Sequence, residues 1–123
     1  MTMTNTTTTC TVLSASTIAS DKVKNLQGET LGSIKDLMID TGTGRVAYAV
    51  LDVGGFLGVG NSLFAVPWSA LQVRTDEKCF VMDANKQLLK AAEGFDQDHW
   101  PDFADQNWGA RVHAHYGASP YWQ

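Results

Sequence analysis

The run from Arg45 to Val53, RVAYAVLDV, is almost wholly apolar and restricts the fold more than any other part of the chain. A strand that lacks regular polar alternation lies deep in a protein. The sequence therefore predicts that this segment is the most buried strand of the fold. The preceding turn, Thr41-Gly42-Thr43-Gly44, supplies two residues able to adopt positive φ, which a short hairpin loop requires.

The segment before that turn, Leu31–Asp40, is predicted as a strand with an irregular pattern. Its apolar positions switch parity, since Ile34 and Met38 fall on one face and Leu37 and Ile39 on the other. A flat, half-buried strand alternates cleanly between its two faces. The switch therefore predicts a coiled or bulged strand in a small, strongly curved sheet.

The segments after the apolar run add further strands. A glycine-rich loop, GGFLGVG, leads into a strand over Ser62–Val66, which Pro67 ends because proline cannot donate to a ladder. Trp68–Leu71 is predicted as a single turn that lays the indole over an open barrel end. Leu71–Thr75 and Cys79–Met82 then form a last hairpin. Five or six short strands with glycine turns predict an all-β barrel or sandwich.

Composition divides the chain into three parts. Residues 1–14 are rich in threonine and have too little apolar surface to offset the entropy of ordering them, so we predict a disordered leader. Residues 15–94 hold the strands, the first of which is polar, punctuated by Ile18, Val23 and Leu26, and followed by a glycine-centred turn. Residues 95–123 form an extension.

One short helix is predicted between the last hairpin and the extension. Asp83 is its expected cap, and the helix continues through Glu93. The inward stripe of this helix consists of Leu88, Leu89 and Ala92.

The extension is polar and acidic at first, yet it is rich in aromatic residues. So many rings do not suit a solvated linker, and they must be buried either on their own barrel or against another chain. Together with the apolar tip of the glycine loop and the turn tryptophan, they form the predicted contact surface. The candidate partner-binding residues are Phe56, Leu57, Trp68, Trp100, Trp108, Tyr116, Tyr121 and Trp122.

The polar residues form no catalytic pattern. The glycine loop lacks the Lys-Ser/Thr of a P-loop and opens a strand rather than a helix. No Ser, His and Asp spacing suggests a triad, and Cys79, on a predicted strand, is expected to be a buried structural thiol. We predict no enzyme activity, no catalytic residue and no cofactor.

Three histidines, His99, His113 and His115, lie among aspartates in the extension. In an extended segment His113 and His115 would face the same way, so they are the candidates for a metal site. Nothing in the sequence fixes a third ligand, and we predict no metal site.

The charge balance restricts the partners. The net charge is -4 and the pI about 5.1, which opposes a broad basic surface for nucleic acid. No stretch approaches the ~18 apolar residues of a spanning helix, so neither nucleic acid nor a membrane span is expected and a cytoplasmic location is predicted.

Residues spread over several strands and turns carry a family likeness. They are Gly28-Glu29, Leu31-Gly32, Ile34, Asp36-Leu37, Ile39-Asp40, Gly44-Arg45-Val46, Tyr48-Ala49-Val50, Gly54-Gly55-Phe56-Leu57-Gly58 and Ala65-Val66-Pro67-Trp68. Over about Ser16 to Phe95 the chain resembles the PRC-barrel family, which includes the cytoplasmic domain of the photosynthetic reaction centre H subunit and the C-terminal domain of a ribosome-maturation factor. The resemblance implies a small, strongly curved β-barrel of five or six strands that serves as a docking surface without catalytic residues.

The resemblance does not carry over a specific role, because the chain lacks the transmembrane helix of the first relative and the partner domain of the second. We predict a non-catalytic protein-interaction module whose partner is another protein, and the apolar loop tip and ring-rich tail also predict a homodimer. The alternative is a small-ligand or metal-binding regulatory domain.

Overall fold

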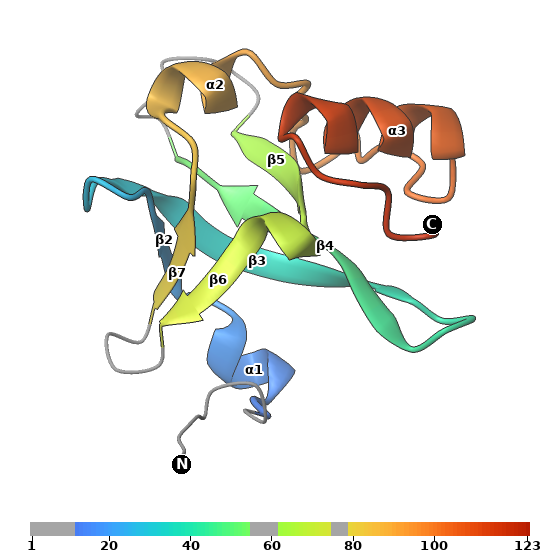
Figure 1. The fold of residues 1–123 in the computed structure, drawn as a ribbon, viewed down its shortest axis with the longest axis horizontal. Helices are drawn as coiled ribbons and strands as arrows, with labels where there is room; N and C mark the ends of the chain where they lie inside the picture. Colours follow the sequence, from blue (N-terminus) through green and yellow to red (C-terminus); the bar gives the residue numbers. More distant parts are fainter. Residues whose placement is uncertain (1–11, 55–61, 75–78) are drawn as a thin grey trace.

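The computed structural model describes residues 12–54, 62–74 and 79–123, and these build mostly β structure around one six-stranded sheet (Figure 1). The strand order is β5-β4-β3-β2-β7-β6, so the sheet is open, with β5 and β6 at its edges. Neighbouring strands are antiparallel except for β2 and β7, which are parallel. The strands are β2 (Lys22–Lys24), β3 (Thr30–Asp40), β4 (Arg45–Asp52), β5 (Leu63–Pro67), β6 (Leu71–Arg74) and β7 (Cys79–Met82).

The long β3–β4 hairpin confirms the predicted irregular strand. Its register shifts twice, between Ile34 and Asp36 and between Met38 and Ile39. Each shift changes the face on which the following side chains lie, which explains the switch of parity in the sequence. The turn between the strands places Gly44 at a φ of 77°, a conformation that suits glycine.

Strand β4 owes its apolar sequence to burial on both faces. Its residues Ala47–Leu51 are all buried, but β5 and β7 are buried at every position, so the prediction that β4 is the most buried strand is wrong. Side chains from one face enter an inner cluster formed by Ile18, Val23, Leu31, Ile34, Ala49, Leu51, Val53, Phe64, Val66, Phe80, Met82, Ala84 and Leu89. Those from the other face enter an outer cluster formed by Ala47, Tyr48, Val50, Leu63, Ala65, Phe95, Trp108 and Val112.

The prediction of a strand from Ala15 is wrong for its first residues. Residues Ala15–Ile18 form a short helix, α1, because the Ser14 side chain accepts a hydrogen bond from the amide of Thr17 at 3.1 Å and caps it. The helix turns Ile18 into the inner cluster. The glycine-centred turn that follows β2 is confirmed, with Gly28 at a φ of 86°.

The hairpin of β6 and β7 and the turn before it agree with the sequence prediction. Pro67 is the last residue of β5, and a 3₁₀ turn, η2 (Trp68–Ala70), leads into β6. Every residue of β7 is buried, including Cys79.

The described chain has more helix than the single one predicted. Helix α2 (Lys86–Lys90) is shorter than expected and is capped by Asn85 rather than Asp83, because the Asn85 side chain accepts from the Leu88 amide at 2.8 Å. Leu89 is fully buried, as the predicted stripe requires. A further helix, α3 (Gln106–His115), lies in the extension beside β5 (Figure 1). Within the described ranges no helix has the length and apolar character needed to cross a membrane.

Candidate interaction surface

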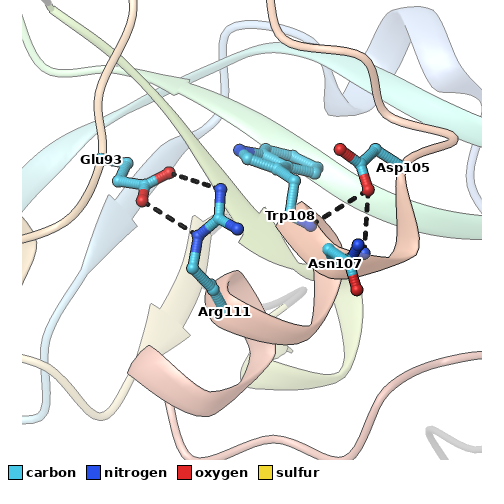
Figure 2. Close-up of polar contacts among 5 residues, drawn as sticks. All are labelled: Glu93, Asp105, Asn107, Trp108 and Arg111. Atoms are coloured by element: carbon cyan, nitrogen blue, oxygen red, sulfur yellow. Dashed lines mark hydrogen bonds and ion pairs between the residues drawn. The ribbon is translucent and has the colours of Figure 1, made fainter.

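Asp105 caps the N-terminus of α3, and its carboxylate accepts hydrogen bonds from amides that have no partner within the helix. Its Oδ1 accepts hydrogen bonds from the amides of Asn107 at 2.9 Å and Trp108 at 3.4 Å (Figure 2). The sequence prediction missed this helix, although Trp108 and Val112 have the spacing of neighbours on one helix face. Both are buried in the outer cluster, so tertiary packing holds the helix in place.

Figure 2 also shows the ion pair that joins α3 to the segment before it. The Arg111 Nε lies 3.1 Å from the Glu93 Oε2, and their side chains are 57% and 59% exposed. An exposed pair of this kind contributes roughly 0–1 kcal/mol. The extension is therefore attached to the sheet chiefly by its apolar side chains.

Tyr48, on β4, is the centre of the aromatic packing. Its ring centroid lies 5.7 Å from that of Phe103, 5.3 Å from Trp108, 5.3 Å from His113 and 5.7 Å from Tyr121. The tilted and edge-to-face angles are those that aromatic pairs prefer. One buried strand residue thus contacts rings from most of the length of the extension.

Gly109 permits this close approach of α3. A β-carbon on Gly109 would lie 2.6 Å from the Tyr48 hydroxyl oxygen and 3.0 Å from a ring carbon of Trp122. The lack of a side chain at this position lets Tyr48 and Trp122 meet the helix backbone directly. Gly109 therefore has a packing role that a helix propensity scale would not predict.

The interior of this packing contains polar atoms. The Nδ1 of His113 donates a hydrogen bond to the Gly109 carbonyl at 2.7 Å, whereas the His113 Nε2 and the hydroxyls of Tyr48 and Tyr116 have no hydrogen-bond partner among the described residues. Burial raises the pKa of Tyr48 to about 12, with a smaller contribution from Tyr121, and burial also raises the pKa of Tyr116. Both phenols are therefore protonated at neutral pH.

A groove opens between the tip of the β3–β4 hairpin and the extension, and we call it the hairpin groove. Its volume is about 270 Å³. Ile39, at its edge, is 50% exposed, which is high for an isoleucine on a strand. The lining residues are Met38, Ile39, Asp40, Thr41, Ala47, Tyr48, Phe103, Ala104 and Tyr121.

The structure brings together five of the eight predicted contact residues. Trp100, Trp108, Tyr116 and Tyr121 pack in or against the outer cluster, and Trp122 contacts His113 with ring centroids 5.5 Å apart. Their proposed contact with a partner stays a prediction.

The remaining predicted contact residues lie elsewhere. Trp68 packs against the inner cluster, with its ring centroid 5.7 Å from that of Phe80. Phe56 and Leu57 lie outside the described residues.

Sequence reasoning missed most residues of the hairpin groove. Ile39 was recognised only as part of an irregular strand, and neither Asp40 nor Tyr48 was singled out for contact. The available signal was the parity switch at Ile39, since a β-bulge can turn an apolar side chain away from the core.

The three histidines do not form a common site. His99 is exposed and bonds Asp96 at 2.8 Å, an interaction that lowers the pKa of that carboxyl. His113 and His115 lie on helix α3 rather than in the extended segment considered above, so they do not face the same way. His115 donates from Nε2 to the Leu88 carbonyl at 2.7 Å. No group of three His, Cys, Asp or Glu residues that could hold a metal ion occurs in the described part of the chain.

These features define a class of protein: a small, mostly β domain whose sheet carries an aromatic extension on its outer face. A family model, the PRC-barrel domain, matches residues 11–89, and the chain belongs to this family. PRC-barrel domains are in general non-catalytic interaction modules. A comparison with curated proteins finds no match. The family match ends within α2, so α3 and the rings of the extension lie beyond it.

Proposed function

We propose that this chain is a non-catalytic protein-interaction module that binds a protein partner through the hairpin groove. The observation that carries the proposal is the exposure of Ile39 at the edge of a groove of about 270 Å³. Isolated exposed apolar residues are common, but a concave apolar lining beside one is typical of a contact site. Membership of a family of interaction modules supports the same conclusion.

The construction of the groove also supports this function. One wall comes from paired strands, in which Met38 faces Tyr48 across the β3–β4 ladder. The opposite wall comes from Phe103 and Tyr121, which pack against Tyr48. Side chains held by a sheet and by contacts between rings lose little further freedom when a partner binds, so less of the binding free energy is lost to ordering.

The proposal is tested by partner capture with two matched variants. Ile39→Ser removes apolar surface from the groove, and Val73→Ser removes it from another exposed strand position, where Val73 is 37% exposed and does not line the groove. Full-length protein, native or variant, is used as bait in an extract of the cells that make it. A partner retained by the native protein and by Val73→Ser should be lost with Ile39→Ser.

A second measurement determines whether the partner is another copy of the chain. Light scattering of the native protein over a range of concentrations gives its mass, and a dimer that Ile39→Ser converts to monomer would identify the partner as a second copy. Equal capture by native protein and Ile39→Ser, together with equal masses, would contradict the proposed use of this groove. Matching thermal midpoints for the two variants are the control for folding.

A further inference from the structure

We infer that the hairpin groove receives a basic side chain, arginine or lysine, from the protein partner. This inference rests on the proposed function and names the chemistry that the groove recognises. Three properties of the lining support it: a carboxylate without an ion-pair partner, aromatic rings, and apolar side chains that can contact the methylene groups of an arginine or lysine.

The carboxylate belongs to Asp40, which lines the groove and is half-buried. Its Oδ1 accepts a hydrogen bond from the amide of Gly42 at 3.0 Å. Arg45 is its partner in the β3–β4 register, yet Asp40 forms no ion pair within the described ranges. A half-buried negative charge in a mostly apolar lining favours an incoming cation over an apolar group, which would desolvate the carboxylate without compensation.

A second cleft provides a comparison, because its carboxylate forms an ion pair within the chain. That cleft has a volume of about 200 Å³ and lies between β5, α3 and the segment that follows α2, with Glu93 and Arg111 both in its lining. There Arg111 of the same chain forms an ion pair with the Glu93 carboxylate (Figure 2). The lining of the hairpin groove contains the Asp40 carboxylate and no lysine or arginine, so a basic side chain of a partner would complement its charge.

The rings of the groove add a second attraction for a cation. Phe103 and Tyr121 line it and are partly exposed, and the faces of aromatic rings attract guanidinium and ammonium groups. Met38 and Ile39 supply an apolar surface for the methylene stem that such side chains bury while their charged end reaches a polar group. Asp102, exposed and adjacent to Phe103, adds negative charge beside this wall.

The inference is tested with two capped pentapeptides added to the full-length protein. One has arginine between two leucines, and the other has citrulline, a neutral analogue of nearly the same shape, at the same position. Methyl NMR signals of Met38, Ile39, Ala47 and Ala104 report binding in the groove. We expect the arginine peptide to shift these signals saturably and to bind about tenfold more tightly than the citrulline peptide.

Asp40→Asn is the decisive variant because its side-chain oxygen can still accept from Gly42 while the charge is removed. It should abolish the preference for arginine and leave the thermal midpoint unchanged. Equal binding of the two peptides to the native protein, an arginine preference that survives in Asp40→Asn, or no shift of the groove signals at millimolar peptide would each overturn the inference.

The result is distinguishable from failure of the proposed function. If Ile39→Ser loses the captured partner and Asp40→Asn retains it fully, the groove is an interaction site but does not select a basic side chain, and the inference falls alone. If neither variant changes capture, the proposed function falls as well.

Discussion

The backbone of Gly109 lies so close to the hydroxyl of Tyr48 that a β-carbon at position 109 would be only 2.6 Å from that oxygen. This contact joins the middle of α3 to the middle of β4. The contact is possible because Gly109 has no side chain, and the position of the extension on the sheet depends on it.

Gly109→Ala should therefore destabilise the protein, although alanine favours a helix by up to about 1 kcal/mol over glycine. The overpacking cost in a filled interior is about 1–3 kcal/mol, so a net loss is expected. Urea denaturation followed by tryptophan fluorescence measures it. A gain in stability would show that α3 is free to move away from Tyr48.

A double-mutant cycle with Tyr48→Phe assigns this cost to the hydroxyl. Removing the oxygen takes away the atom that a β-carbon would meet, so Gly109→Ala should cost about 1 kcal/mol less in the Tyr48→Phe background. Tyr48→Phe alone should be neutral or stabilising, because the hydroxyl is buried without a partner among the described residues. Additive effects of the two substitutions would place the strain elsewhere.

Stability should fall at alkaline pH because of Tyr48. Its pKa is raised to about 12 in the folded protein, against about 10 for an unfolded tyrosine. Between these values the unfolded state loses the proton first, so the free energy of unfolding is fully retained below pH 10 and decreases as the pH rises toward 12. Denaturation from pH 8 to 11.5 measures the slope.

Tyr48→Phe is the control for this slope, because it removes the titrating group and keeps the ring. The native protein should lose stability more steeply above pH 10 than the variant does. Parallel curves for the two proteins would exclude Tyr48 as the source of the alkaline loss.

The two polar contacts of Figure 2 should differ in strength. Asp105→Ala removes the cap of α3 and should cost about 1 kcal/mol. Arg111→Gln breaks an exposed ion pair with Glu93 and should cost less than about 0.5 kcal/mol. Urea midpoints of the two variants make the comparison, and a larger loss for Arg111→Gln would mean that the ion pair, rather than the cap, holds the helix.

Local rules predicted the β3–β4 hairpin well. The positive φ of Gly44 in its turn, though not one at Gly42, and the parity switch of β3 depend on neighbouring residues, so a sequence pattern records them directly. The same holds for the buried strand at Arg45–Val53, whose apolar character reflects burial on both faces. The sequence did not reveal what covers the second face.

The extension was harder to predict because its helix depends on tertiary contacts. Gly109 lowers the helix propensity of α3 at the position where packing requires it, so propensity and packing conflict there. The hairpin groove was not predictable for a related reason. Asp40 and Tyr121 are far apart in the sequence, and no local pattern indicates that they line one groove.

Strands β4 and β5 contribute side chains to both apolar clusters, and this restricts where the chain can be truncated. The family match ends at residue 89, but Phe95, Trp108 and Val112 complete the outer cluster beyond it. A chain ended at the limit of the match would leave Ala47, Val50 and Leu63 facing water, and self-association would be expected. The boundary defined by sequence similarity thus passes through a core, and the smallest unit with both clusters intact includes α3.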